Sequence, residues 1–516
     1  MLIKKYLPLN TLSLGLLLTS SIMLTACGGD STDSTAPSIS NLHPNSNAVT
    51  QSRQVIITGQ ASDDVELESV VIMSEEQSIT AEINDGSFSA TLEASAGQNT
   101  YSVIATDISG NETSSEESFY FGAQASAGGA HSAIIKNERI YAWGRNNKGQ
   151  AGIGAITTIN DDPETASAAH PTTPTLISVP SDTSSLIDSE ETHFVSLAFN
   201  QNASSALDVN GQVWSWGDGD DGQLGLGIAD DDLVDETNYT SPQKIENLSD
   251  IVSISRGYDH MLLLKSDGTV LAFGDNSNGQ LGDGSNLDQD TPVEVAGLTN
   301  IVQISAAVSS YAIDTEGRLW AWGKNNYGQL ANGVSDSDVH STPTEINIGE
   351  PVINVASGKG HTLALTSSGQ VYAWGLNASS QVGMNPSDAS DEDEVWDNYV
   401  LTPKLLPWFD DVVAIWANGN QSFAQRSDGQ IYPWGQNMLG TLGIEEDGNV
   451  AEPVSPILEL ENVTDLGNGA LHTLAIRNDE AVFAWGWSFE GSLGGGESVA
   501  NLWTYRLPLL VSMPED

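Results

Sequence analysis

The sequence predicts an all-β protein in which a β-sandwich precedes a seven-bladed β-propeller. Two observations support this fold class. Short alternating apolar runs fill residues 37–121, and a motif with Trp-Gly followed by Gly-Gln-Leu-Gly then recurs in seven copies. The glycines after the motif's Trp or Phe are spaced 49 to 73 residues apart: Gly144, Gly217, Gly274, Gly323, Gly375, Gly435 and Gly486. A period near fifty residues with uneven gaps indicates repeated structural units that carry loops of different length.

The composition narrows the class of partner. The chain of 516 residues has 69 acidic and 17 basic side chains, a formal net charge of −52. Such a surface repels phosphate backbones, so we expect no nucleic-acid partner. The charge could attract cations or a basic partner, but the composition favours a merely solubilising surface. The single cysteine, Cys27, leaves no intrachain disulfide and no cysteine zinc cluster.

Residues 1–27 have the pattern of a secretory signal peptide, with lysines first, then a short apolar run and small residues. The last four, Leu-Thr-Ala-Cys27, resemble the bacterial lipobox, which implies lipidation of Cys27 as the mature N-terminus. By the same resemblance, Gly28 after the cysteine implies export to the outer membrane, at its periplasmic or cell-surface face. Residues 28–36 are small and polar and predict a flexible tether between this anchor and the folded part.

Residues 37–121 predict an antiparallel sandwich of about seven strands, because alternating apolar runs are separated by Asp-Gly and Ser-Gly-Asn turns. The segment resembles the bacterial immunoglobulin-like domains that lie between anchors and functional modules. Four residues at predicted loop ends offer the hard oxygen ligands that Ca²⁺ prefers: Asp63, Asp64, Asp107 and Asn111. Solvated turn residues are the favoured interpretation and calcium binding is the alternative, and we expect no other cofactor.

Residues 123–516 hold the repeats. In each unit, apolar runs are joined by a turn such as Asp-Gly, which is a hairpin signal. Because the runs are apolar at successive positions, each small sheet needs cover on both faces, and radial stacking of the sheets provides it. We expect residues 507–513 to complete the blade that opens near Ala123, so that the two ends of the propeller share one blade.

The stretch GKGHTLALTSSGQVYAWG, residues 358–375, and the following Trp-Gly-x-Asn-x-x-Gly-Gln-Leu-Gly core resemble the regulator of chromosome condensation repeat. The resemblance covers about residues 123–516 and implies a seven-bladed propeller. The family's best-known member is a nucleotide exchange factor for the small GTPase Ran, which makes exchange-factor activity one alternative function. Export and the acidic charge both argue against it, whereas other relatives bind proteins with a propeller face.

The repeated residues are interpreted as structural. We expect the motif's Asn to close Asx turns and its Gln to satisfy backbone groups of the same loop. The motif's Trp is expected to fill space between blades. Four histidines occupy one column of the repeat and are expected to be buried and hydrogen-bonded rather than metal ligands: His131, His260, His361 and His472.

No catalytic motif of the common hydrolase, metalloprotease or nucleotide-binding types is found, so the sequence favours a binding protein over an enzyme. Recognition is expected in loops that differ between repeats: 155–175, 228–241 and 384–402. The last loop combines acidic and aromatic side chains that suit a basic protein surface or a sugar ring: Asp391, Glu392, Asp393, Glu394, Trp396 and Tyr399. A plainly solvated loop is the alternative. Four further tryptophans lie outside the repeated column: Trp408, Trp416, Trp487 and Trp503.

The leading hypothesis is therefore a membrane-anchored, extracytoplasmic scaffold protein whose propeller loops bind a protein partner. An extracytoplasmic glycan-binding protein or hydrolase that uses loop carboxylates is the second, and an exchange factor is the third.

Overall fold

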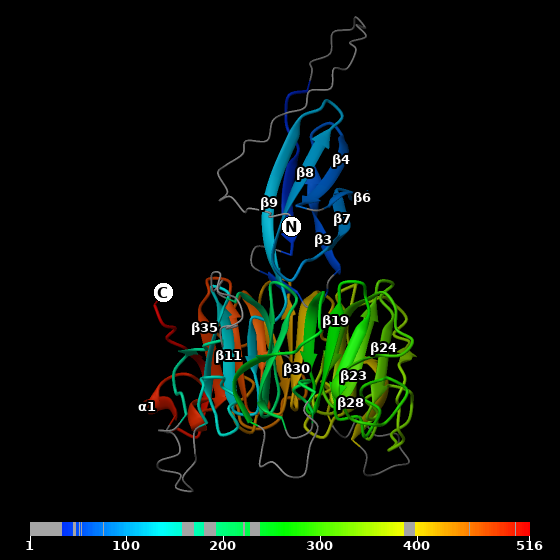
Figure 1. Ribbon diagram of the computed structural model, residues 1–516. Coiled ribbons are helices and arrows are strands. Elements are labelled where there is room, and N and C mark those ends of the chain that lie inside the picture. The colour runs from blue at the N-terminus through cyan, green and yellow to red at the C-terminus, as the bar shows by residue number, and fades with distance from the viewer. Residues whose placement is uncertain are drawn as a thin grey trace, which may run out of the picture.

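The computed structural model describes residues 33–44, 48–50, 52, 54–75, 77–156, 170–179, 192–219, 222–227, 238–385, 398–453, 455–500 and 502–515. Within these ranges the protein is nearly all β, with a sandwich that stands on one face of a propeller (Figure 1). The helices described are the 3₁₀ turn η3 (Phe489–Gly491) and α1 (Glu497–Ala500). None of the helices in the described ranges is long and apolar enough to cross a membrane. The expected order, a sandwich followed by a propeller, is confirmed.

The sandwich consists of two sheets with an apolar core between them. One sheet has the order β1 (Ser38–His43), β3 (Gln54–Ser62), β7 (Ser87–Glu93), β6 (Glu82–Asn84). The other has the order β2 (Ala48–Thr50), β9 (Glu112–Phe121), β8 (Gly97–Asp107), β4 (Leu67–Ser74), β5 (Ser78–Thr80). Alternate residues point inward, so that Ile57, Val70, Phe88, Val103 and Phe119 are buried together. The three shortest strands, β2, β5 and β6, bring the described strands above the expected seven.

Seven sheets follow in the described ranges, and we number them as blades 1 to 7 in chain order. Blade 1 is β10 (Ala125–Ala127), β11 (His131–Lys136), β12 (Arg139–Gly144), β13 (Thr175–Leu176). Blade 2 is β14 (Phe194–Phe199), β15 (Ala203–Asp208), β16 (Val213–Asp218), β17 (Asn238–Lys244). Blade 3 is β18 (Ile251–Arg256), β19 (His260–Lys265), β20 (Val270–Gly274), β21 (Gln289–Glu294). Blade 4 is β22 (Ile301–Ala306), β23 (Ser309–Asp314), β24 (Leu319–Gly323), β25 (Thr344–Ile346).

Blade 5 is β26 (Val352–Ser357), β27 (His361–Thr366), β28 (Val371–Leu376), β29 (Tyr399–Leu405). Blade 6 is β30 (Val412–Asn418), β31 (Gln421–Arg426), β32 (Ile431–Gly435), and blade 7 is β33 (Val463–Asn468), β34 (His472–Arg477), β35 (Val482–Trp487), β36 (Thr504–Leu510). The first strand of every blade is innermost, and neighbouring first strands contact one another around the axis. The chain therefore runs outward within each blade and returns to the axis for the next.

Blade 6 has three strands in the described part of the chain, and one residue explains the difference. In blade 5, Ala373 of the third strand pairs with Lys404 of the fourth. Pro433 occupies the equivalent position in blade 6, flanked by outward backbone bonds from Ile457 N to Ile431 O (2.8 Å) and from Gly435 N to Val450 O (2.8 Å). Proline has no N–H to donate, so it interrupts the ladder at the point where a fourth strand would pair.

The expectation that residues 507–513 complete the first blade is wrong. Leu509 pairs with Ala484 of β35, so β36 is the outer strand of blade 7, while β10 pairs with β11 inside blade 1. The two end blades instead meet side by side. The buried carboxylate of Asp465 accepts the backbone N–H groups of Gln124 (2.7 Å) and Ala125 (2.9 Å), which closes the ring at this seam.

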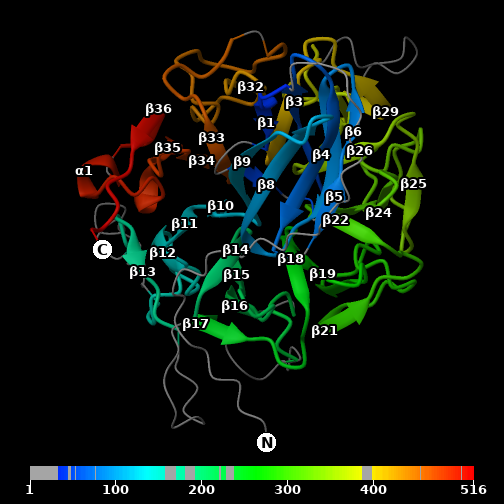
Figure 2. The same ribbon diagram turned by 90° about the horizontal axis from the view of Figure 1, so that it is seen from above.

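The sandwich covers the propeller face where the innermost strands begin (Figures 1 and 2). Buried Tyr120 at the end of β9 packs in one cluster with Val195 of β14, and Val252 of β18 packs against the sandwich core. Gly97 and Gly122 also lie close against Val195, where an added Cβ atom would meet it at 3.0 and 2.7 Å. The opposite face carries the turns after the innermost strands and the repeated Gly-Gln-Leu-Gly loops, and we call it the motif-loop face. The sandwich leaves this face uncovered.

Candidate functional site

The repeated motif builds a hydrogen-bond network between neighbouring blades. Trp216 of blade 2 donates its indole N–H to the carbonyl oxygen of Gln150 in the blade 1 motif (2.9 Å), and Ser204 donates its hydroxyl to the same oxygen (2.9 Å). The His131 Nε2 lies 2.9 Å from the Ser204 Oγ. The same indole-to-carbonyl bond is made by Trp143, Trp322, Trp374, Trp434 and Trp485. The motif therefore joins adjacent blades, in agreement with the structural interpretation of its Trp.

The histidine column is buried and hydrogen-bonded, as expected. Each Nε2 contacts a serine of the next blade, at 2.8 Å for His260 and Ser310, 2.8 Å for His361 and Ser422, and 2.6 Å for His472 and Ser132. Because these serines donate their only hydroxyl proton to a motif carbonyl, the Nε2 must donate and the Nδ1 carries no proton. Burial lowers the pKa to about 3 for His131, His361 and His472 and to about 4 for His260.

Asparagine and glutamine hold the motif loop itself. The Gln280 Oε1 accepts the backbone N–H of Asn278 (2.9 Å), which confirms the expected role, and Gln150, Gln329 and Gln381 repeat this bond. The asparagine differs from the Asx-turn expectation. The Asn276 Oδ1 accepts the N–H of Leu281, five residues later, at 3.0 Å, and its Nδ2 donates to the Leu287 carbonyl at 3.1 Å. The loop is too wide for an Asx turn, and the asparagine spans it instead.

Blade 3 lacks the usual donors to the motif carbonyl of the preceding blade, and an arginine replaces them. Phe273 stands in the Trp column and Met261 in the serine column, so neither side chain donates to the Gln223 carbonyl of blade 2. Arg256 of β18 donates to that carbonyl at 2.9 Å and also contacts the hydroxyls of Ser205 and Ser215. Burial lowers the pKa of Arg256 to about 9. The repeated Trp, His, Ser, Asn and Gln residues therefore have structural roles, either between neighbouring blades or within the motif loop.

The residues predicted for partner binding fall mostly outside the described ranges: Asp391, Glu392, Asp393, Glu394 and Trp396. Cys27 also lies outside them. Tyr399 is described, at the start of β29, with its ring centroid 5.4 Å from that of Tyr327 in the blade 4 motif loop. Both tyrosines are partly exposed on the motif-loop face. This pair fits a contact surface, and the binding role of the acidic loop stays a prediction.

Of the four tryptophans outside the repeated column, Trp408 and Trp416 pack against blade cores. The other two, Trp487 and Trp503, form an aromatic cluster with Phe489 at the motif loop of blade 7, which we call the blade 7 platform. The Phe489 ring stacks on Trp503 with centroids 5.8 Å apart and planes at 15°, and lies 5.7 Å from Trp487. Trp503 is 75% exposed. Sequence reasoning named both tryptophans but missed Phe489, which only the fold brings between them.

The calcium candidates lie at one end of the sandwich. Asp63 and Asp64 group with Asp33, which sequence reasoning missed, and carboxylate oxygens of the three lie within 4.8 Å of one another. Asn111 donates to the Asp107 Oδ2 at 2.7 Å and to the Asp33 carbonyl at 3.3 Å. Asp107 also accepts the N–H of Ser109 and of Asn111, so it closes the β8–β9 turn. Calcium binding here stays a prediction.

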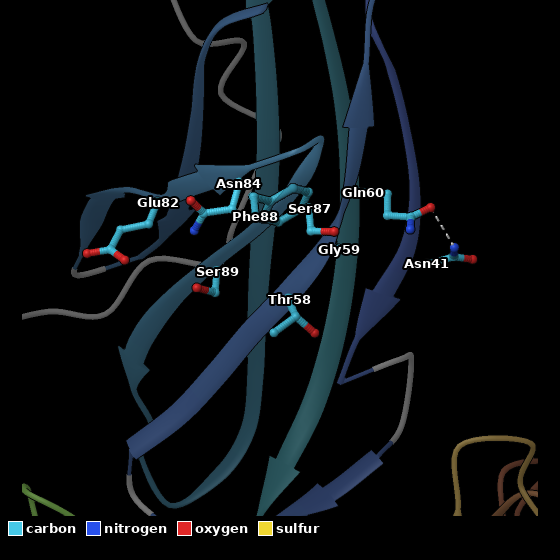
Figure 3. Close-up of a pocket in the computed structure, with 9 residues that line it drawn as sticks. All are labelled: Asn41, Thr58, Gly59, Gln60, Glu82, Asn84, Ser87, Phe88 and Ser89. Carbon is cyan, nitrogen blue, oxygen red and sulfur yellow. Dashed lines mark hydrogen bonds between the residues drawn. The ribbon is translucent and has the colours of Figure 1, made fainter. Parts of the chain in front are cut away.

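Three hollows lie among the described residues. One of about 590 Å³ lies beside β12 and β13 of blade 1 and is lined by Arg139, Tyr141 and His193, with Pro514 and Glu515 near the end of the chain. The two others are smaller. One, of about 370 Å³, lies on the outer face of the first sandwich sheet and is polar, with Thr58, Glu82, Asn84 and Ser89 around it (Figure 3). The other lies at the propeller axis, is lined by turns after the innermost strands of all seven described blades, and holds about 50 Å³ of accessible space. It includes Asn200, which bonds to the carbonyl of Tyr258 in the next blade. None of these three hollows brings together a catalytic set of side chains among the described residues.

Comparison with known proteins identifies the propeller. The family model for the RCC1-like domain matches residues 94–404. The chain belongs to the RCC1-like family. A second model, domain B of glucodextranase, matches residues 37–119, which supports the immunoglobulin-like interpretation of the sandwich.

Relatives of this RCC1-like chain have varied architectures. The chain is 30% identical over 388 residues to the ultraviolet-B receptor UVR8 of Arabidopsis thaliana, with 72% of this chain and 79% of the receptor covered. It is 28% identical over 399 residues to the human E3 ubiquitin-protein ligase HERC2, where 75% of this chain but only 7% of the ligase is covered. The similarity therefore concerns the propeller and not the ligase as a whole.

Solved structures show the same fold. Prp20p of Saccharomyces cerevisiae, studied for its binding to Gsp1p and histones, has a TM-score of 0.58 at 24% identity, over 68% of this chain and 81% of its own. The complex of Kap60 with yeast RCC1 (Prp20) gives a TM-score of 0.55 at 25% identity, over 67% and 78% of the two chains. The comparisons thus place an RCC1-like propeller in the second part of this chain.

Proposed function

We propose that this protein is a lipid-anchored, extracytoplasmic binding protein whose RCC1-like propeller recognises a protein partner through the motif-loop face. The observation that supports this choice is the position of the sandwich. Because Tyr120, Gly97 and Gly122 pack onto Val195 at the other face, the sandwich occupies part of that face and leaves the motif-loop face open to a partner (Figure 2). A propeller is a scaffold whose connecting loops carry recognition.

The side chains on the free face suit protein contacts. Tyrosine and tryptophan are enriched at the energetically important points of protein interfaces. Here the face offers the pair of Tyr327 and Tyr399 and the blade 7 platform with exposed Trp503. Prp20, a protein of the same fold, is known in complex with Kap60. These observations support a protein partner rather than a small substrate, for which none of the three hollows among the described residues supplies a catalytic set.

The anchoring part of the proposal rests on the sequence of residues 1–36. Lipidation of Cys27 and a short polar tether would hold the sandwich near the bilayer and present the propeller away from it. Metabolic labelling with palmitate tests this directly. Wild-type protein is expected to be labelled and to fractionate with the outer membrane, whereas Cys27→Ala is expected to lose the label. Labelling that persists in Cys27→Ala, or unlabelled wild-type protein in the cytosol, contradicts the anchor and revives the exchange-factor alternative.

Photo-crosslinking on the full-length protein tests which face binds. A benzophenone amino acid in place of Tyr399 reports on the motif-loop face. The matched control places it at Leu458, which is 76% exposed and precedes Asn462, whose backbone bonds to the turn at Gly429 on the sandwich side. We expect a discrete protein adduct from position 399 and none from position 458. The same adduct from both positions contradicts the assignment of the face, and enrichment of glycans without any protein favours the glycan-binding alternative.

A further inference from the structure

The motif loop of blade 7 lacks the Asn and Gln whose side chains bond across most of the other motif loops. Ser488 stands where five copies have the spanning Asn, and Ser492 stands where most have Gln. Ser488 is buried, and its N–H bonds to the carbonyl of Trp503 (3.2 Å) while its hydroxyl bonds to that of Leu502. Ser488 therefore ties the start of β36 to the loop, and this tie positions Trp503.

An ion pair between blades 7 and 1 holds the backbone that carries the blade 7 platform. Glu490 adopts a left-handed backbone conformation (φ 63°), is buried, and pairs with the Arg145 guanidinium of blade 1 at 2.6 Å. The turn η3 that contains Glu490 also contains Phe489, so the ion pair sets the ring on which Trp503 stacks. Rings held by backbone bonds and by an ion pair with a buried carboxylate lose little conformational freedom when a partner binds. Such preorganised, exposed aromatic side chains suit an anchor point.

Charge determines what the platform suits. Arg145 already lies over the Trp487 ring, 6.0 Å from its centroid, so this cluster accommodates a guanidinium on an indole face. The two arginines nearest the platform are paired, Arg145 with Glu490 and Arg506 with Asp447, whereas Glu497 at the start of α1 is exposed. On a chain with a net charge of −52, an incoming cation is attracted to this surface, and both of these arginines are already neutralised by a carboxylate.

A sugar ring fits the platform less well. Glycan sites combine a stacking ring with several convergent polar groups. Leu502, which precedes Trp503, is apolar and 45% exposed. The hydroxyl of buried Ser488 donates to a backbone carbonyl and so offers no donor to a sugar. A cation needs only the indole face and the surrounding negative potential.

We propose that the blade 7 platform binds a lysine- or arginine-bearing segment of the partner protein, with the cation over the exposed face of Trp503. The inference rests on the proposed function and names the chemistry of the partner at one point of the motif-loop face. Glu497, exposed at the start of α1, adds negative charge to the same loop. Phe489 and Trp487 hold Trp503 in place.

The experiment compares binding of an acetylated tri-arginine peptide to full-length wild type, Trp503→Ala and Leu458→Ala by calorimetric titration. Leu458 is 76% exposed and Trp503 is 75% exposed, so the control removes a similarly exposed apolar side chain at the opposite face without changing the net charge. We expect Trp503→Ala to weaken the peptide about 2- to 5-fold, as for an exposed cation–π contact, and Leu458→Ala to match wild type. Trp503→Phe is expected to fall between them, because it keeps a weaker aromatic face.

Unchanged tri-arginine binding by Trp503→Ala overturns the inference, as does Trp503-dependent binding of a chito-oligosaccharide in place of the peptide. Near-ultraviolet circular dichroism of each variant establishes that the exposed substitution leaves the fold intact. Failure here is separable from failure of the proposed function. A partner that still crosslinks from position 399 while Trp503→Ala binds tri-arginine normally refutes the platform and leaves the motif-loop face standing.

Discussion

Acidification is expected to destabilise the propeller through its four buried histidines. Each donates from Nε2 to a serine of the next blade, and the Nδ1 of His131, His361 and His472 has no hydrogen-bond partner among the described residues. Protonation of Nδ1 would therefore bury an unpaired charged donor. The folded-state pKa values of about 3 to 4 lie below the unfolded value of 6.5. The stability they contribute is complete above that value and is lost as the pH falls toward the folded pKa.

The size of the effect follows from the difference between pH 5 and the unfolded pKa. At pH 5 each histidine favours the unfolded state by about 2 kcal/mol, so four contribute about 8 kcal/mol. Asp465 acts in the opposite direction, because burial raises its pKa to about 6. Its stabilising contribution grows as the pH falls through 6 and amounts to about 1 kcal/mol at pH 5. The histidines therefore dominate.

Urea unfolding at pH 7 and pH 5, followed by the fluorescence of the buried tryptophans, measures this loss. The informative variant is His361→Gln, because blade 6 already holds a buried glutamine, Gln421, in the same column. Between the two pH values the variant is expected to lose about 2 kcal/mol less free energy of unfolding than wild type, since one titrating group is gone. Equal losses in both proteins would refute the tautomer and burial argument.

Two further substitutions test the joints between blades. Arg256→Ser is expected to lower the free energy of unfolding by about 3 kcal/mol, because it leaves the Gln223 carbonyl without its donor. Adding Phe273→Trp is expected to restore part of this loss, because the indole N–H can donate to the same carbonyl. A double-mutant cycle in urea that shows no coupling between positions 256 and 273 contradicts the role given to Arg256. Asp465→Ala removes the acceptor for the Gln124 and Ala125 N–H groups at the ring seam, and is expected to destabilise the protein by about 3 kcal/mol, whereas Asp411→Ala on the partly exposed surface is expected to change the melting temperature little.

Strand positions and the repeated loops were predictable because each carries its own local signal. Every blade repeats an apolar run, a turn and a Trp-Gly, or Phe-Gly in blade 3, and such a pattern needs no long-range information. The ring closure was not predictable in the same way. Strand β10 is only Ala-Ser-Ala, and its place beside Asp465 depends on a contact between residues 340 apart in the sequence. The sequence shows which residues can pair but not that the ring closes by side-on packing.

The candidate site was predictable in part. Trp487 and Trp503 were distinguished by lying outside the repeated column, and this is a signal that the sequence displays. Their grouping with Phe489 depends on the left-handed conformation of Glu490, a non-glycine residue whose strain no pattern reveals. That conformation is maintained by Arg145, which belongs to the first blade and lies 345 residues earlier. The pattern within a single repeat cannot predict a site whose residues come from both end blades.

The position of the platform links recognition to ring closure. Arg145 of blade 1 pairs with Glu490 and covers Trp487 of blade 7, and the N–H of Gly496 bonds to the Thr172 carbonyl (2.9 Å) across the same seam. The seam joins the two ends of the propeller by side-chain and backbone contacts rather than by a shared sheet. A partner that binds the platform touches groups that fix both end blades, and binding to the folded state alone stabilises it. The motif loop of blade 7 therefore differs from the repeat in a way that affects both closure and recognition. Its ion pair between Glu490 and Arg145 joins the two end blades, and the same ion pair positions the ring on which Trp503 stacks.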